Sequence, residues 1–184
     1  MYRVIILILL LFLVLNSFSN KIDNFNNYNK YIYLKGAEGF GDRLQCLLEC
    51  IEVSLNKNRI IIVDWRDNQW THKPEHDFHY YFSFDKKIPT IKLEELKNRN
   101  IKSIFPKYWE NKENLFNITH KNDLYRDDCK IKKDNKWIKD IEKNDLIVHP
   151  CVGYRTYTYE NVKYINLKKH VLDYIKESLK EIGI

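Results

Sequence analysis

The order of apolar and polar residues predicts strands that alternate with helices. Residues 31–34 are β-prone, and glycines follow at positions 36, 39 and 41. Apolar residues then recur every three or four positions, which is typical of one helix face, at Leu44, Leu47, Leu48, Ile51 and Leu55. Residues 56–58 are expected to end this helix, before an apolar run over 59–64 that is typical of a buried parallel strand. The pattern predicts a right-handed βαβ unit.

The rest of the chain continues the alternation less regularly. The predicted segments are an aromatic-rich loop (65–84), a short helix (93–96), a strand (101–105), a polar irregular stretch (107–144), a strand (145–149) and an amphipathic helix (166–181). Strands alternating with helices predict an α/β fold with a Rossmann-like parallel sheet of about four strands and helices on both faces.

The amino terminus predicts the compartment. An unbroken apolar run, Val4–Leu15, follows Arg3, and small residues stand at Ser17 and Ser19. As a helix this run spans about 18 Å, short of the ~30 Å core of a bilayer. Residues 1–19 are therefore expected to be a signal peptide cleaved after Ser19 or, as the alternative, an uncleaved type II anchor held in the membrane by residues 4–15. In both cases the rest of the chain enters the lumen of the secretory pathway. A polar stem (20–30) and one α/β domain (31–184) then follow.

Charge and composition limit the classes of partner and of structure that are expected. The net charge is +6, and 24 of the 31 basic residues are lysines, accompanied by 19 asparagines. These lysines are spread along the chain and form no run of five or more, so no nucleic-acid partner is expected. Apolar residues make up 44% of the chain, enough for a real core, and this excludes disorder throughout.

Several smaller signals remain open. The cysteines are even in number, which permits disulfides in an oxidising lumen; Cys129 with Cys151 is one candidate pair, whereas Cys46 and Cys50 lie four apart on the predicted helix. Asn117-Ile118-Thr119 is an N-glycosylation acceptor sequence. Two further groups have more than one interpretation. His72, His76, Asp77 and His79 are a metal site or loop packing, and Trp65, Trp70, Tyr80, Tyr81 and Phe82 are a sugar-stacking platform or a hydrophobic cluster.

The glycine turn is the strongest chemical signal. Gly39 and Gly41 are expected to need a positive φ or to let a ligand approach the backbone, and Asp42 is expected to cap the helix. A helix amino terminus suits a phosphate, to which Arg43 adds a fork of donors. The glycine spacing differs from G-x-G-x-x-G, so a dinucleotide site is not predicted.

The turn and its flanks resemble a known family. Residues 35–45 (KGAEGFGDRLQ), the helix and residues 58–65 (NRIIIVDW) are similar to the opening βαβ unit of the fucosyltransferase superfamily, which includes nodulation and core α1,6-fucosyltransferases and protein O-fucosyltransferases. Residues 77–84 are similar to a segment that often follows. The resemblance implies half of a GT-B architecture, in which two Rossmann-like domains face each other across a sugar-nucleotide cleft.

Roles follow from this resemblance. It implies that Gly39, Phe40, Gly41, Asp42 and Arg43 border the cleft and bind donor or acceptor, and that Glu38 is the general base on the acceptor hydroxyl. The alternative for Glu38 is a solvated loop carboxylate. The donor would be GDP-fucose and the acceptor a glycan or a protein, with no metal or other cofactor.

The chain departs from the family in one respect. No H-x-R-x-[TS]-D-like motif, which holds the donor diphosphate in the second domain, occurs in the sequence. The chain is therefore expected to be the N-terminal half alone, inactive by itself or paired with a separate C-terminal half. A non-catalytic lumenal module that binds glycans or proteins is the alternative function.

Overall fold

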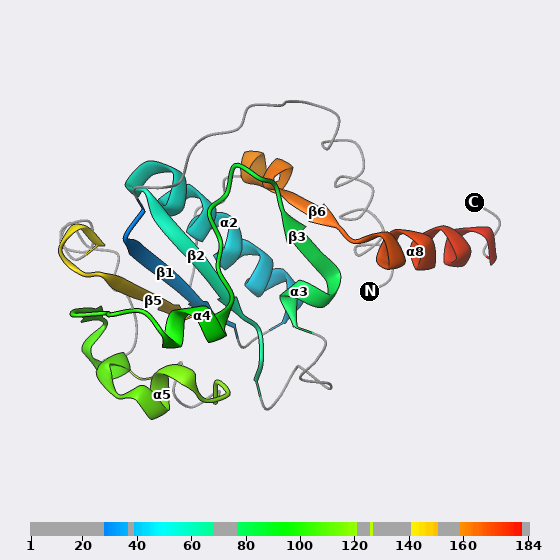
Figure 1. The fold of residues 1–184 in the computed structure, drawn as a ribbon. Helices are drawn as coiled ribbons and strands as arrows, with labels where there is room; N and C mark the ends of the chain where they lie inside the picture. Colours follow the sequence, from blue (N-terminus) through cyan, green and yellow to red (C-terminus); the bar gives the residue numbers. More distant parts are fainter. Residues whose placement is uncertain are drawn as a thin grey trace.

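A parallel sheet organises the fold, as seen in a computed structural model that describes residues 28–36, 39–67, 77–120, 126, 141–150 and 159–181. The sheet has the strand order β2-β1-β5-β4, and its three neighbouring pairs all run parallel (Figure 1). Its strands are β1 (Lys30–Lys35), β2 (Arg59–Asp64), β4 (Ile104–Phe105) and β5 (Leu146–Pro150). The predicted α/β class with a four-stranded parallel sheet is confirmed.

The predicted βαβ unit is present with its boundaries nearly as expected. Helix α2 (Phe40–Lys57) joins β1 to β2, and Asn58 ends it in the left-handed conformation, with φ of 50°. The prediction that Asp42 caps α2 is wrong, because the helix begins two residues earlier and Gly39 is its N-cap. Asp42 lies exposed in the first turn, where its negative charge suits the helix dipole.

Helices and turns cover both faces of the sheet. One face packs against α2, and its core includes Ile32, Leu34, Leu47, Ile51, Ile61, Val63 and Ile147. The other face packs under α4 (Leu93–Lys97), η1 (Lys107–Glu110) and α5 (Lys112–Phe116), and its core includes Tyr33, Ile62, Leu96, Trp109, Leu115 and Val148. Alternate residues of each strand thus enter different cores, which explains why the strands read as continuous apolar runs.

Arg59 ties the amino ends of three segments together. Its side chain is fully buried, and it donates to the carbonyl oxygens of Tyr31 at 2.9 Å, Asp145 at 3.2 Å and Asn144 at 2.8 Å. Burial lowers the pKa of Arg59 to about 10, against the opposing effect of the Asp145 carboxylate. This part of the Asn58-Arg59 motif is therefore structural.

The predicted loop over 65–84 is wrong in its last part. Residues 68–76, with Trp70, His72 and His76, lie outside the described residues, but α3 (Phe78–Tyr81) and β3 (Phe82–Phe84) follow them. The Asp77 carboxylate caps α3 by accepting from the backbone N–H of His79 at 2.8 Å. Strand β3 pairs antiparallel with β6 (Ile165–Leu167), a second two-stranded sheet that the sequence pattern did not indicate.

The carboxyl-terminal helix is shorter than predicted. Residues 165–167 form β6 after the 3₁₀ turn η2 (Tyr159–Tyr164), so α8 (Lys169–Glu181) begins three residues later than the predicted start at residue 166. None of its residues is buried, and it leads away from the sheet (Figure 1).

The middle of the chain is more regular than predicted. The stretch expected to be irregular contains η1 and α5, while the strand expected over 101–105 is limited to β4, two residues long. The outer edge of β2 is partly covered, since Ile61 accepts from Ile91 and donates to Pro89 through backbone groups. Residues 121–125 and 127–140 of this stretch lie outside the described residues.

The described residues leave the amino-terminal prediction untested. The segment 1–27, with the expected signal or anchor and most of the stem, lies outside them. Among the helices that the structure does describe, none has the length and apolar character needed to cross a bilayer. Cys46 and Cys50 are both fully buried in α2 and form no disulfide with each other, whereas Cys129 and Cys151 lie outside the described residues.

Candidate functional site

The candidate site lies at the carboxyl ends of the central strands. Lys35 of β1 stands in register with Asp64 of β2 on one side and with Pro150 of β5 on the other. The glycine turn continues from Lys35 at this edge, and the amino terminus of α2 begins there. In open parallel sheets, ligands bind in the crevice outside the carboxyl ends of the strands. The resemblance and the topology therefore point to the same edge.

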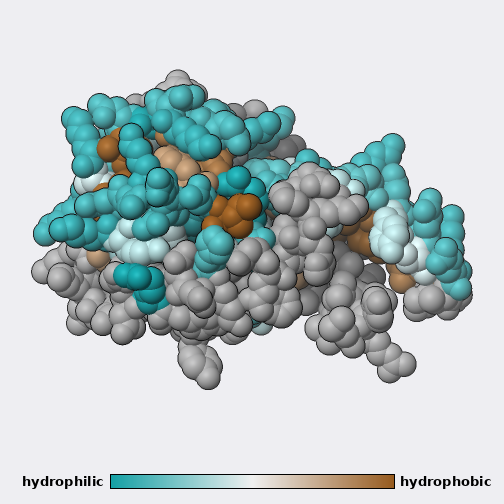
Figure 2. Space-filling model, turned by 90° about the horizontal axis from the view of Figure 1, so that it is seen from below, coloured by the Kyte–Doolittle hydropathy of each residue, from teal (hydrophilic) through white to brown (hydrophobic). Residues whose placement is uncertain are grey.

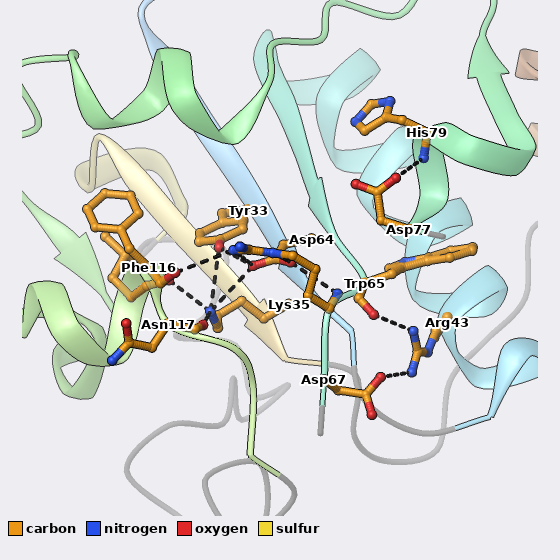
Figure 3. A network of polar contacts seen from close by, with 12 residues as sticks. Tyr33, Lys35, Arg43, Asp64, Trp65, Asp67, Asp77, His79, Phe116 and Asn117 are labelled. Carbon is orange, nitrogen blue, oxygen red and sulfur yellow. Dashed lines mark hydrogen bonds and ion pairs between the residues drawn. The ribbon is translucent and has the colours of Figure 1, made fainter. Parts of the chain in front are cut away.

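A buried ionic network closes the inner side of this edge. The Arg66 guanidinium donates to both Asp64 carboxylate oxygens, at 2.8 Å from Nε and 3.0 Å from Nη2. The Tyr33 hydroxyl donates to Asp64 Oδ2 at 2.7 Å, and the Lys35 ammonium lies 3.7 Å from the same oxygen (Figure 3). The side chains of Lys35 and Asp64 are at most 1% exposed, so the pair is shielded from solvent.

Electrostatics favours the charged form of Asp64. Burial raises the pKa of this carboxyl, but the hydrogen bond from Arg66, the charges of Lys35 and Arg66 and the hydrogen bond from Tyr33 outweigh burial and hold the pKa below its usual value. The same contact raises the pKa of Arg66, chiefly through the hydrogen bond to Asp64. Burial and the Asp64 charge raise the pKa of Tyr33 well above its ordinary value. Asp64 is thus an anchored anion rather than a proton acceptor.

Lys35 also fixes a distant loop. Its ammonium donates to the backbone oxygens of Leu115 at 2.8 Å and Asn117 at 2.9 Å (Figure 3). The same nitrogen lies 5.4 Å from the centroid of the Trp109 ring, within range of a cation–π interaction. The end of α5 is thereby held against the carboxyl ends of the sheet.

Arg43 points inward from the first turn of α2. Its Nη1 donates to the backbone oxygen of Trp65 at 2.6 Å, and its Nη2 forms a buried ion pair with Asp67. The side chain of Asp67 is fully buried and that of Arg43 is 7% exposed. These contacts make Arg43 a tie between α2 and the segment after β2. Its expected contact with a donor or acceptor stays a prediction.

The glycines differ from the sequence expectation. Of the two alternatives for these glycines, a positive φ is wrong for Gly39, whose φ is −64°, and the close approach of a ligand stays a prediction. Gly41 lies inside α2, where an added Cβ would meet no atom of another segment within 4 Å. Close approach is instead required at Gly36, where an added Cβ would lie 2.7 Å from Cδ1 of the Trp65 ring. The turn needs glycine for packing against Trp65.

The remaining predicted site residues lie at the start of α2. Phe40 is 43% exposed, and its ring stacks on Phe82 at a centroid distance of 5.9 Å. Gly39 is half-buried at the N-cap, and Phe40, Gly41 and Asp42 are exposed in the first turn, whereas the side chain of Arg43 is buried. Glu38 lies outside the described residues, so its role as base stays a prediction.

The aromatic residues after β2 divide between core and surface. Trp65, Phe78 and Phe82 are buried in the α2-side core, in favour of the hydrophobic-cluster interpretation for these rings. Tyr80 is 39% exposed and contacts His170 edge to face.

Burial lowers the pKa of His79, with Lys168 and Lys92 acting in the same direction and Asp77 and Glu94 opposing it. No group of three or more potential metal-ligating side chains occurs within the described ranges.

One polar pair was missed by sequence reasoning. His149, near the carboxyl end of β5, is buried, and its Nε2 lies 3.3 Å from the Glu49 carboxylate of α2. A histidine inside an otherwise apolar strand is the available signal, but its partner is one hundred residues away in sequence. The pair joins β5 to α2.

Comparison with known proteins gives a similarity in fold but none in sequence families. The sequence matches no family model and no curated protein. Solved structures of the α1,6-fucosyltransferase NodZ are similar in fold. One, soaked with GDP-fucose, has a TM-score of 0.56 and 19% identity; NodZ from Bradyrhizobium has a TM-score of 0.55 and 19% identity, and NodZ co-crystallised with GDP has a TM-score of 0.52 and 18% identity.

The matched regions are unequal in the two chains. The similarity to the GDP-fucose-soaked structure covers 83% of this chain but 55% of NodZ, so this chain spans about half the length of the structures it matches. Mixed α/β topology, a parallel sheet and helices on both faces agree between them. The chain therefore has a fucosyltransferase-like fold, resembling one half of a GT-B glycosyltransferase.

Proposed function

We propose that this chain is a glycosyltransferase-like domain that takes part in transfer of fucose from GDP-fucose to a glycan or protein acceptor. The observation that carries the proposal is the similarity in fold, over 83% of the chain, to NodZ soaked with GDP-fucose. The glycine turn supports it, because the turn and the amino terminus of α2 lie at the carboxyl edge where α/β proteins bind ligands.

The proposed reaction is a displacement at the anomeric carbon. The acceptor oxygen forms a bond to this carbon while the bond to the diphosphate oxygen breaks, so that GDP leaves with the electron pair and the configuration inverts. Glu38 takes the proton of the acceptor hydroxyl. The positive end of the α2 dipole favours the diphosphate charge, with no metal ion required.

Transfer is proposed to need a second half. An H-x-R-x-x-D-bearing half, supplied separately, would hold most of the donor diphosphate and provide the binding energy that orients the reacting carbon. This chain would then contribute the acceptor side of the cleft. Its expected affinity for GDP-fucose on its own is weak.

The test is a pair of measurements on the full chain. Ligand-observed NMR compares GDP-fucose and GDP with UDP-galactose as a control, and transfer is assayed after addition of a candidate second half. Glu38→Gln should remove transfer and leave donor binding unchanged, while Glu177→Gln, which neutralises an exposed carboxylate of α8 away from the turn, should retain transfer. Equal binding of all three nucleotides, or full transfer by Glu38→Gln, would exclude the proposed roles.

A non-catalytic glycan-binding module is the second candidate. The exposed Phe40 ring, supported from behind by Phe82, favours it, because such a ring can stack on a sugar face. Oligosaccharide binding that is lost in Phe40→Ala, together with no transfer under any pairing, would select this function over the first.

The lumen of the secretory pathway is the proposed compartment. The apolar run over 4–15 supports it, and Asn117 is exposed in the fold, as a glycosylated side chain must be. Translation with microsomes should give a protected chain with one glycan that Asn117→Gln removes. A protease-sensitive chain without glycan would contradict this placement.

A further inference from the structure

A hollow lies on the side of the sheet that α4 and α5 cover. It has a volume of about 610 Å³ and lies between α4, β4 and α5. Leu146 and Ile104, the first residues of β5 and β4, are in its lining, so it lies towards the amino ends of the strands. The glycine turn is at the opposite ends. In Figure 2, which views the side that is lowest in Figure 1, hydrophobic residues (brown) show between hydrophilic ones (teal).

The lining combines an apolar floor with a cationic rim. Leu96, Leu115 and Leu146 are almost fully buried and form part of the floor. Four basic side chains surround it and are exposed, namely Lys97, Arg99, Lys102 and Lys112, against a single lining carboxylate, Glu110. The local charge of the lining is therefore strongly positive, and the hollow combines this charge with a smaller apolar area.

The walls of this hollow are held in place. The α5 wall is fixed from behind, since the Leu115 backbone oxygen accepts from Lys35 at 2.8 Å and the Phe116 oxygen accepts from Arg66 at 3.4 Å. On the α4 side, the Lys97 ammonium lies 5.6 Å from the Phe116 ring centroid. The cavity is thus preformed, and the binding of a ligand would cost little free energy for ordering its walls.

We propose that this hollow binds a small amphipathic anion, a molecule with an aliphatic or aromatic body and one carboxylate, sulfate or phosphate group. The aliphatic or aromatic body of the ligand packs against the floor of the hollow, where burial of its carbon surface is favourable. Its anionic group lies beside the exposed basic side chains of the rim. Arg99 offers a fork of donors that matches an oxyanion, and Lys102 adds a second positive charge. The site is independent of the proposed sugar transfer.

The test uses 1-anilinonaphthalene-8-sulfonate, an aromatic sulfonate, as fluorescent probe on the full chain. Arg99→Gln/Lys102→Gln should weaken probe binding about tenfold or more, the loss of an ionic contact to the sulfonate. Lys176→Gln/Lys180→Gln is the matched control. It removes the same charge from exposed positions of α8, on the other side of the sheet, and should bind the probe as the unchanged chain does.

Displacement of the probe by other compounds identifies the class of ligand that the hollow binds. Laurate, an aliphatic carboxylate, should displace the probe, whereas the same concentrations of inorganic phosphate or of the neutral detergent octyl glucoside should not. Displacement by phosphate would show a plain anion site, and displacement by octyl glucoside a plain apolar one; either overturns the proposal. Unchanged binding by Arg99→Gln/Lys102→Gln also overturns it. If that variant does not fold, Lys97→Gln/Lys112→Gln takes its place with the same expected loss.

Discussion

At the scale of single residues, charged groups in this protein stabilise the backbone of the candidate site. Lys35, Arg43 and Arg66 all donate to carbonyl oxygens and also form ion pairs with carboxylates. A charged side chain that donates to backbone oxygens fixes a loop more firmly than an ion pair alone. It supplies hydrogen bonds to buried carbonyl groups that would otherwise have no donor. The carboxyl edge of the sheet is therefore held from its inner side, while Phe40, Gly41 and Asp42 in the first turn of α2 are exposed.

Gly36 is expected to be the sensitive glycine of the turn. Gly36→Ala places a Cβ against the Trp65 ring and should lower the free energy of unfolding by about 1–3 kcal/mol. Gly41→Ala, which meets open space within a helix, should be neutral or stabilising. Urea unfolding of both variants checks this, and equal destabilisation would contradict the assigned contact.

Removing Arg43 should affect folding strongly. Arg43→Ala leaves the Asp67 carboxylate buried without its ion-pair partner, at a cost of about 3–5 kcal/mol in unfolding free energy. Arg43→Ala/Asp67→Asn should recover a part of that loss, because no buried charge remains uncompensated. Chemical denaturation of the single and double variants measures the difference. An Arg43→Ala variant as stable as the parent would show that the tie is unimportant and leave Arg43 available for a ligand.

Asp64 should make stability depend on pH in the acid range. Its pKa is held below the unfolded value of about 3.9, so its contribution is fully present above that pH and is lost as the pH falls through the lower, folded value. Asp64→Asn should flatten this acid dependence, while Asp173→Asn on α8 should retain it. Urea midpoints between pH 6 and pH 2.5 test the prediction, which fails if both variants keep the parent slope.

At the scale of elements, the sequence predicted the helices and strands that have an apolar pattern of their own. It missed the strands that form only by pairing with distant residues. Helix α2 and strands β1, β2 and β5 have long apolar patterns, and the predicted bounds agree within a few residues. Strands β3 and β6 contain three residues each and exist because they pair across 80 residues of chain. No local pattern indicates such a partner.

The same distinction applies to the candidate site. The glycine turn and Arg43 could be located from a motif, but the inward direction of Arg43 follows from Asp67, which the motif does not contain. Lys35 was interpreted as part of the turn, whereas its partners lie in α5 and directly after it, 80 and 82 residues away. Contacts between segments determine these roles, so the motif alone could not predict them.

The end of α2 offers a clean test of backbone strain. Asn58 adopts φ of 50°, which glycine accepts freely and alanine does not. Asn58→Ala should cost about 1 kcal/mol in unfolding free energy, and Asn58→Gly should be neutral or gain up to about 1 kcal/mol. Thermal unfolding of the two variants gives the order, and a more stable alanine variant would contradict the left-handed cap.

At the scale of the whole molecule, stability is distributed unevenly. The sheet lies between two cores, whereas α8 has no buried residue and leads away from the sheet. Its apolar residues Val171, Leu172 and Ile175 contact the α2-side core only partly.

Hydrogen exchange should reveal this gradient. Amides of α8 are expected to exchange through local opening, at rates well above those of β1 and β5, because opening the helix exposes little buried surface. Mass spectrometry of exchanged peptides from the full chain measures the two regions side by side. Equal protection of α8 and the central strands would show that the helix unfolds only with the whole domain.

The cover over the outer edge of β2 has a consequence for behaviour at high concentration. An open edge strand offers unpaired backbone groups to a second molecule, and this is a common route to aggregation. Here the segment 89–91 already occupies the Ile61 backbone on one side of the sheet, and on the other side β4 is two residues long. The most apolar strands of the chain are therefore poor templates for growth by strand addition, which leaves the sheet compatible with a crowded cellular compartment.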